Sequence, residues 1–208
     1  MTNDLKPLNL KLFFLAVLFW MSCCFVFWYL LHDMIIQPAA LLSGMALDSL
    51  LPDVLDEMKL HKGQLVLITQ LGELNGTIMP AHQAGNQIAY QINPRVVSYS
   101  LPFIVSLLLA SSDRKTFNKI LISLCILYPI VVSGIIFQSL KELLFGSRQM
   151  HDYLTGQSDV TMLNEIIAIG YQFSTLIIPA VAPVIIWSWL ENKRISALIA
   201  RVPDQDKP

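Results

Sequence analysis

Charged residues are scarce in this sequence, and their scarcity decides the class of protein. Asp, Glu, Lys and Arg make up 14% of the 208 residues, while hydrophobic residues make up 54%. Soluble domains usually carry about 25% charged residues, so the composition argues against an ordinary soluble domain and favours a membrane protein. The net charge of −1 gives no overall basic field, and we expect no nucleic-acid partner.

The sequence also lacks the residue patterns of common catalytic and metal sites. The three cysteines, Cys23, Cys24 and Cys125, lie in apolar stretches, which predicts small buried side chains and no disulfide framework. The four histidines form no i, i+4 pair, and neither a nucleophile elbow nor a phosphate-binding glycine loop occurs. We therefore expect no cofactor, no metal and no enzyme active site.

Four long apolar stretches, at 12–31, 96–112, 120–140 and 166–190, contain no charged residue. A transmembrane helix needs about 20 mostly apolar residues, so these stretches predict four spans, the third of which begins at residue 118. The first run is longer than the hydrophobic region of a signal peptide, and we expect it to remain as a membrane anchor. The predicted fold is mainly α, with a small α+β insert between the first two spans.

Lys and Arg near the ends of the spans set the orientation of a membrane protein. Here they concentrate in the two tails and between the second and third spans, while most acidic residues lie in the other connecting segments. This predicts a multi-pass protein of the bacterial inner membrane with both termini in the cytoplasm. The expected organisation is a tail and first span at 1–32, a periplasmic insert at 33–95, three spans within 96–190 that include a periplasmic loop at 141–165, and a cytoplasmic tail at 191–208.

The predicted insert begins with a helical pattern. Apolar residues recur at helical spacing over Pro38–Leu50, and Pro38 is suited to the first turn of a helix. We expect an amphipathic helix along the outer membrane surface. Pro52 is predicted to end it, or to start a short turn that ends near Met58.

The second part of the insert changes to the pattern of β-strands. Residues 64–71 are aliphatic and β-branched, residues 87–93 alternate apolar and polar, and a further edge is possible at 77–79. Gly72 and Asn75-Gly76 are turn signals. The sequence predicts a unit of two or three strands, which is either a cap on the helices or a docking edge for another protein.

Prolines interrupt three of the predicted spans, and two of them lie four residues apart in the last. Each proline removes a hydrogen bond to the carbonyl four residues earlier, and nearby hydroxyls of Ser, Thr and Tyr are expected to satisfy the freed carbonyls. The bent helices either pack closely on one another or form a groove for another transmembrane segment. The candidate residues of this groove and its kinks are Pro102, Pro129, Gln172, Pro179 and Pro183.

A few polar residues lie at the predicted outer ends of the spans: His32, Asp33, Arg95, His151 and Asp152. If they converge, they suit an enzyme that acts on a lipid or peptide at the periplasmic face. A small-solute permease is a further alternative, although it would need a polar path, and charges within the spans are absent.

Three features resemble one bacterial family. They are the segment NPRVVSYSLPFIVSLLLAS at 93–111, the segment GYQFSTLIIPAVAPVIIW at 170–187, and the layout of one span, an α/β insert from Gln37-Pro38, and three further spans. Together they resemble the exosortase H-associated membrane proteins, which are encoded beside a membrane-embedded, transpeptidase-like enzyme. The resemblance implies a non-enzymatic accessory protein with the bilayer and an exosortase-like membrane protein as partners. It carries over no catalytic residue, since the family has no established activity.

Overall fold

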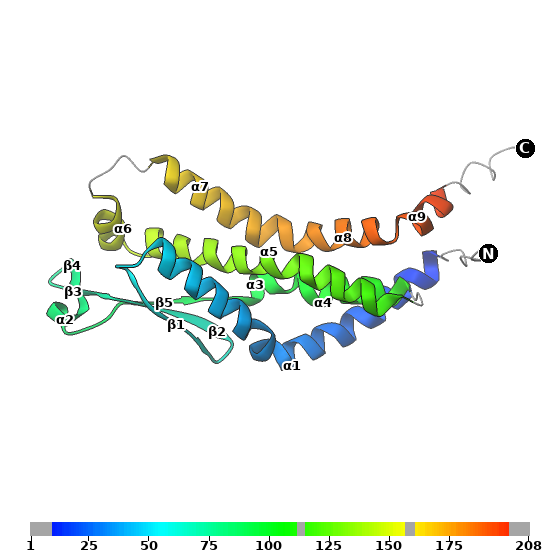
Figure 1. Cartoon of the computed structure of the whole chain (residues 1–208), viewed down its shortest axis with the longest axis horizontal. Coiled ribbons are helices and arrows are strands. Elements are labelled where there is room, and N and C mark those ends of the chain that lie inside the picture. The colour runs from blue at the N-terminus through cyan, green and yellow to red at the C-terminus, as the bar shows by residue number, and fades with distance from the viewer. Residues whose placement is uncertain (1–9, 112–114, 157–160, 200–208) are drawn as a thin grey trace, which may run out of the picture. The chain divides into compact units, whose positions relative to one another are not determined.

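The computed structural model describes residues 10–111, 115–156 and 161–199 (Figure 1). The chain divides into two compact units, each built from separate stretches. Unit 1 comprises Met1–Tyr29, Tyr99–Leu127 and Ala180–Pro208, and unit 2 comprises Leu30–Ser98 and Tyr128–Pro179.

Helices dominate the described residues. They are α1 (Leu10–Leu50), α2 (Ala81–Ala84), α3 (Arg95–Ser98), α4 (Ser100–Ser111), α5 (Thr116–Phe145), α6 (Arg148–Thr155), α7 (Thr161–Gln172), the π-helix η1 (Phe173–Ile177), α8 (Ile178–Leu190) and α9 (Asn192–Ile199). The strands are β1 (Leu55–His61), β2 (Gln64–Thr69), β3 (Leu71–Leu74), β4 (Thr77–Pro80) and β5 (Ala89–Ile92).

Three helical stretches of the described residues are long and apolar enough to cross a membrane. They are Lys11–Leu50, Thr116–Phe145 and Met162–Leu190, and they contain the predicted first, third and fourth spans. The predicted second span corresponds to Arg95–Ser111, an apolar helical stretch that is shorter than the other three. The structure thus confirms a mostly helical protein with several apolar helices, and the count of four spans stays a prediction.

Helix α1 corrects the predicted start of the insert. It is a single helix of 41 residues that contains Pro38 in its interior, so the prediction of a separate helix that opens at Pro38 is wrong. The proline removes only one backbone hydrogen bond, the one that the carbonyl of Met34 would accept. A helix with good packing on both sides of a proline tolerates that loss.

Contacts with α5 on both sides of Pro38 stabilise α1. The Tyr128 hydroxyl donates a hydrogen bond to the Ile35 carbonyl at 3.1 Å. The Ser43 hydroxyl donates to the Ala39 carbonyl in its own helix at 2.7 Å, and it lies 3.3 Å from the Val132 carbonyl of α5. Tyr128 precedes Pro129 in α5, and its hydroxyl bonds across to α1.

The sheet of unit 2 is antiparallel, with the strand order β1-β2-β5. The central strand β2 buries Leu65, Leu67 and Thr69 on one face. His61 pairs with Gln64 across the β1–β2 turn, and both turn residues, Lys62 and Gly63, have positive φ. That conformation is the type I′ turn, whose twist matches that of the flanking strands.

A second, two-stranded sheet pairs β3 with β4. Asn75 and Gly76 form its turn with positive φ, as their sequence predicts. The prediction of a turn at Gly72 is wrong, because Gly72 lies within β3 and a side chain there would collide with Asn86. Asn86 uses its amide to bond the backbone of Glu73 in both directions, at 3.0 Å each, so the glycine makes room for this bridge.

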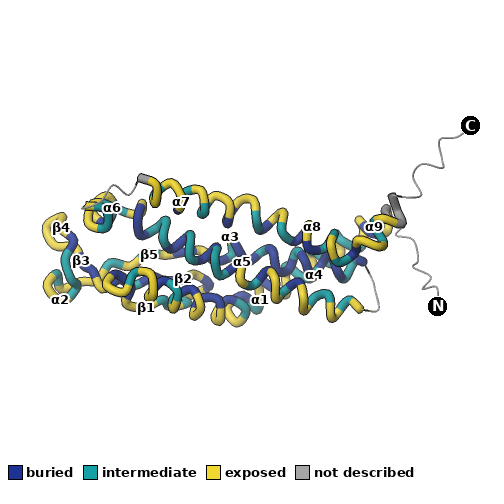
Figure 2. The backbone as a smooth tube through the Cα atoms, turned by 45° about the horizontal axis from the view of Figure 1, so that its top comes forward, coloured by how far each residue is buried: buried dark blue, intermediate teal, exposed yellow. Residues whose placement is uncertain are grey.

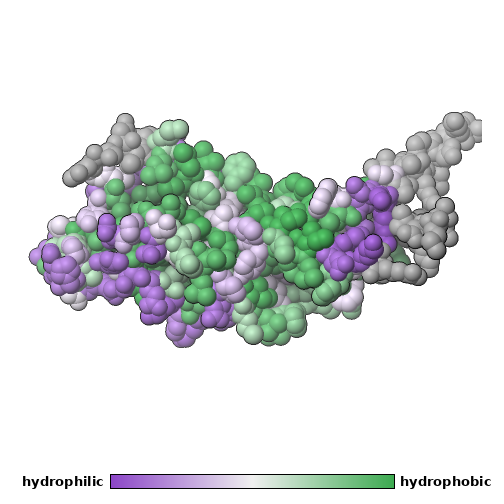
Figure 3. All heavy atoms as spheres, in the orientation of Figure 1, coloured by the Kyte–Doolittle hydropathy of each residue, from purple (hydrophilic) through white to green (hydrophobic). Residues whose placement is uncertain are grey.

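The predicted strands are therefore found as β2, β4 and β5, while β1 and β3 were missed. Residues 55–61 form a strand, and the prediction of a turn ending near Met58 is wrong. Only the first residue of β1, Leu55, is buried, because β1 lies at the edge of its sheet. In Figure 3, hydrophilic residues gather over the strands and α2 and again near α9, whereas hydrophobic residues cover the helices between them.

Glycines let the helices of unit 2 approach closely. A Cβ at Gly134 of α5 would lie 2.8 Å from Val97 Cγ1 of α3, and one at Gly170 of α7 would collide with the ring of Phe137. Small residues at such positions are the usual means by which membrane helices pack. In Figure 2, α7 exposes many of its residues, while α5 shows more buried and intermediate positions.

Candidate functional site

Three of the five polar residues predicted at the outer face lie together in unit 2. The His32 ring is buried with 1% exposure, and its Nδ1 lies 3.4 Å from Asp33 Oδ1. A Cβ built on Gly63 would lie 2.6 Å from Arg95 Nη2 and 3.6 Å from Asp33 Oδ1. We call His32, Asp33, Gly63 and Arg95 the His32 cluster.

Local sequence explains how the His32 cluster forms. The Arg95 backbone N–H donates to Asn93 Oδ1 at 3.1 Å, which fixes the start of α3 and places Arg95 at its first turn. Gly63 has φ of +76° and is buried, so the tip of the β1–β2 turn is directed at the arginine and not at solvent. A glycine is required here for the backbone conformation and for the close approach of Arg95.

The other two predicted residues, His151 and Asp152, make their contacts elsewhere. His151 Nδ1 donates to the Leu144 carbonyl at 2.9 Å, and its ring stacks on Phe145 at 6.0 Å. Asp152 is exposed and lies 4.0 Å from Arg148, one turn earlier on α6. These contacts hold the α5–α6 corner together. None of them joins His151 or Asp152 to the His32 cluster.

The predicted groove residues divide between the two units. Pro102 and Pro183 belong to unit 1 and are buried, while unit 2 holds Pro129, Gln172 and Pro179. Of the latter three, Pro129 and Gln172 are exposed and Pro179 is buried.

The helix adapts to Pro179 in a way the sequence did not indicate. The preceding residues form the π-helix η1, in which the Ile178 N–H donates to the Phe173 carbonyl. The hydroxyls of Ser174 and Thr175 both donate to the Tyr171 carbonyl, at 3.1 and 2.6 Å. The hydroxyls thus bond the Tyr171 carbonyl, one turn earlier, and the wider helical turn accompanies the proline.

A second polar cluster, in unit 1, was missed by the sequence reasoning. Glu191 has a side-chain exposure of 2%, and its carboxylate lies 2.7 Å from Lys119 Nζ and 3.7 Å from Arg194 Nε. Arg194 also donates to the Ser111 carbonyl. The Glu191 cluster thus joins the start of α5, the end of α4 and the α8–α9 junction.

Aromatic residues extend the Glu191 cluster to α1. Trp187 Nε1 donates to Ser111 Oγ at 2.8 Å, and Ser111 Oγ donates to the Leu107 carbonyl at 3.0 Å. Phe13 of α1 stacks on Trp187, with ring centroids 5.4 Å apart. The sequence carried one signal for this site, namely a single acid among basic residues at the end of a span. Its partners come from distant segments, and no local pattern shows them.

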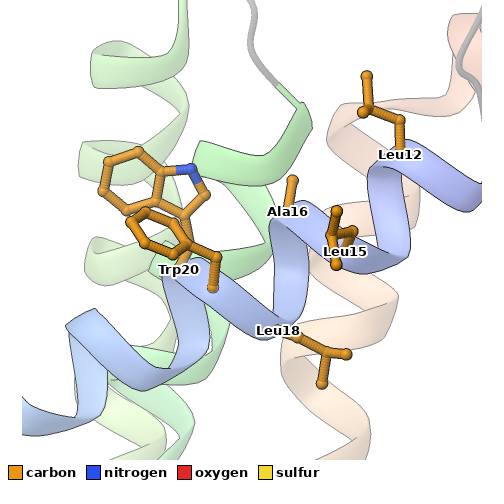
Figure 4. A pocket seen from close by; sticks show the side chains of 6 residues that line it. Leu12, Leu15, Ala16, Leu18 and Trp20 are labelled. Atoms are coloured by element: carbon orange, nitrogen blue, oxygen red, sulfur yellow. The ribbon is translucent and has the colours of Figure 1, made fainter.

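A hollow on the surface of α1 offers no chemistry for a ligand. Its lining comes from one stretch of one helix, as Figure 4 shows, and it consists of Leu12, Leu15, Ala16, Leu18, Phe19 and Trp20. It is the uneven surface of an exposed apolar helix.

The structure also locates the candidate metal ligands and the cysteines of the described residues. No group of three His, Cys, Asp or Glu residues there is arranged to hold a metal ion. The three cysteines form no disulfide, and Cys23 and Cys125 are exposed on apolar helices, which corrects the expectation that their side chains are buried.

Comparisons with known proteins give one result. No curated protein and no solved structure matches this sequence. A family model does match, over residues 7–194, and its description is exosortase H-associated membrane protein. The match covers both polar clusters, all the strands and all the candidate spans. The chain belongs to the exosortase H-associated membrane protein family.

Proposed function

We propose that this protein is a non-enzymatic accessory subunit of the bacterial inner membrane, which binds an exosortase H-type enzyme or the sorting tail of its substrate. The observation that carries the proposal is the family match over residues 7–194. The contacts of the polar residues support it, because the Glu191 cluster pairs its charges in a buried arrangement typical of a structural role.

The proposal includes a four-span topology, with both termini in the cytoplasm and the insert at 33–95 in the periplasm. The uneven distribution of Lys and Arg supports this orientation. The Glu191 cluster adds an argument, since it brings together the end of α4, the start of α5 and the end of α8. A contact among these three helix ends supports a topology in which they share one side of the membrane.

Two of the predicted groove residues are available to a partner. Gln172 and Pro129 are exposed in unit 2, and Gln172 provides an amide that a neighbouring transmembrane segment can bond. The buried prolines, Pro102, Pro179 and Pro183, support packing within the protein.

The test is co-purification with an epitope-tagged exosortase H from membranes of a strain that expresses both proteins. We expect a complex that survives a mild detergent and contains both chains in fixed ratio. An unrelated four-span protein of similar abundance serves as control. If this protein is recovered without exosortase H and without a sorting-tail substrate, the proposed function is wrong.

A second candidate function, catalysis at the periplasmic face, rests on the His32 cluster, which brings an imidazole, a carboxylate and a guanidinium together. His32→Gln distinguishes the two candidates in cells that process a sorting-tail substrate. Lost processing with an intact complex and a normally folded protein would favour catalysis. Normal processing would leave the cluster with a structural role, in which it holds the β1–β2 turn against α1 and α3.

A further inference from the structure

The second half of α1 is apolar on two opposite faces. One face packs inside unit 2, where Ile36, Ala39 and Leu47 have 0% exposure. The opposite face exposes four apolar side chains, which we name the α1 stripe: Met34, Leu41, Leu42 and Met45, with exposures of 73, 62, 50 and 70%. Their spacing of i, i+7, i+8 and i+11 places them on one side of the helix. A helix that is apolar all round needs a cover for its second face.

The hydrocarbon of the bilayer does not reach the α1 stripe. Residues 12–31 of α1 carry no charge and correspond to about 30 Å of helix at about 1.5 Å per residue, which is the hydrocarbon thickness of a bilayer. The uncharged first half fills that thickness. Asp33, whose side chain is 60% exposed, then follows, and an exposed carboxylate marks the edge of the hydrocarbon. Every member of the stripe follows Asp33 in the sequence.

The lipid headgroups are a poor cover as well. Helices that lie on a membrane surface carry Lys and Arg on their polar face, where these residues bind anionic lipids. Residues 34–50 contain neither Lys nor Arg, and their one charged residue is Asp48. Gln37 and Asp48 are exposed and, at about 100° per residue, lie along one edge of the stripe, which gives that edge the polar border found at protein interfaces.

We infer that the α1 stripe is the surface on which exosortase H docks. The part of exosortase H that binds there is an uncharged apolar helix that projects beyond the hydrocarbon. This inference rests on the proposed function and assigns it a place on the molecule. An amphipathic helix that binds in this way presents apolar anchors at i, i+3 or i+4, and i+7. The two methionines suit such a contact, because their flexible thioethers adapt to the shape of the partner.

Photo-crosslinking tests the assignment. The photoreactive residue p-benzoylphenylalanine replaces Leu41 or Met45 in full-length protein that is co-expressed with exosortase H, and it replaces Leu18 as the matched control. Leu18 lies on the same helix within the predicted span and is 61% exposed. We expect probes at 41 and 45 to form an adduct with an apolar helix of exosortase H, identified by mass spectrometry, and the probe at 18 to react with lipid.

Charge substitution provides an independent readout. Leu41→Lys and Met45→Lys change exposed side chains, so we expect free protein that folds normally and a complex with exosortase H that is weakened at least tenfold. Gln83→Lys, an exposed position on α2, adds the same charge elsewhere in unit 2 and is expected to leave the complex unchanged.

The outcomes separate this inference from the proposed function. If the two proteins form a complex but probes at 41 and 45 react only with lipid or with a second copy of this chain, the stripe is not the docking surface and the accessory role stands. An unchanged affinity in both lysine variants leads to the same conclusion. If no complex forms at all, both the inference and the proposed function fail.

Discussion

Replacing Glu191 by Gln tests whether the Glu191 cluster stabilises unit 1. The substitution keeps the size of the side chain and removes the charge that lies 2.7 Å from Lys119 Nζ and 3.7 Å from Arg194 Nε. The side chains of Lys119 and Arg194 are only 17 and 14% exposed, so water compensates them poorly. Removing one partner of a buried ion pair costs about 3–5 kcal/mol. Arg194 keeps the Ser111 carbonyl as an acceptor, and we therefore expect a loss at the lower end, about 3 kcal/mol.

The assay is unfolding by SDS in mixed micelles, followed by far-ultraviolet circular dichroism. Glu165→Gln is the matched control, because Glu165 is exposed on α7 and its loss is expected to change the free energy of unfolding by less than about 0.5 kcal/mol. A double-mutant cycle with Lys119→Met isolates the pair, for which we expect a coupling of about 1–3 kcal/mol. If Glu191→Gln costs no more than Glu165→Gln, the carboxylate is not a buried partner of the two cations, and the reasoning fails.

Three further predictions test packing, the His32 cluster and topology. Gly134→Ala places a Cβ 2.8 Å from Val97 Cγ1, so we expect a loss of about 1–3 kcal/mol in SDS unfolding, and Val97→Ala in the same chain should restore most of it. Gly63→Ala forces a side chain into positive φ and against Arg95; we expect a loss of about 1–2 kcal/mol, and proteolysis of the β1–β2 turn at the wild-type rate would contradict this. An alkaline phosphatase fusion at Asn75 is expected to be active, since the proposed topology places this turn in the periplasm, and an inactive fusion with an active cytoplasmic reporter at the same position would reverse the proposed orientation.

Local chemistry explains which elements the sequence predicted well. The turn Asn75-Gly76 has the residue types that positive φ requires, and β2 has the aliphatic and β-branched residues of a central strand. Strand β1 was missed because its sequence, LDEMKLH, is mostly charged and polar. Such residues are common in edge strands, where they discourage pairing with other chains, but they give a sequence no recognisable alternation.

The missed features depend on contacts between distant segments. The pattern after Pro38 predicts a helix that starts there. That prediction fails because the Tyr128 hydroxyl of α5 supports α1 across the proline, a contact that the sequence does not show. Among the outer-face candidates, adjacency in sequence explains why His32 lies beside Asp33, whereas the β1–β2 turn and α3 bring Arg95 near them. The Glu191 cluster joins residues 72 positions apart, a separation that no periodicity reveals.

The order in which the chain is made gives the Glu191 cluster a consequence for biogenesis. Lys119 begins α5 and leaves the ribosome long before Glu191, which follows the last apolar helix, and synthesis proceeds from the N-terminus. Until that helix enters the membrane, the Lys119 ammonium lacks the Glu191 carboxylate, which lies 2.7 Å from it in the folded chain. Arrival of α8 with Glu191 then completes the cluster, so that insertion of α8 and stabilisation of α4 and α5 become a single step. In a chain stalled on the ribosome before residue 191, α5 would lack the ion pair between Lys119 and Glu191.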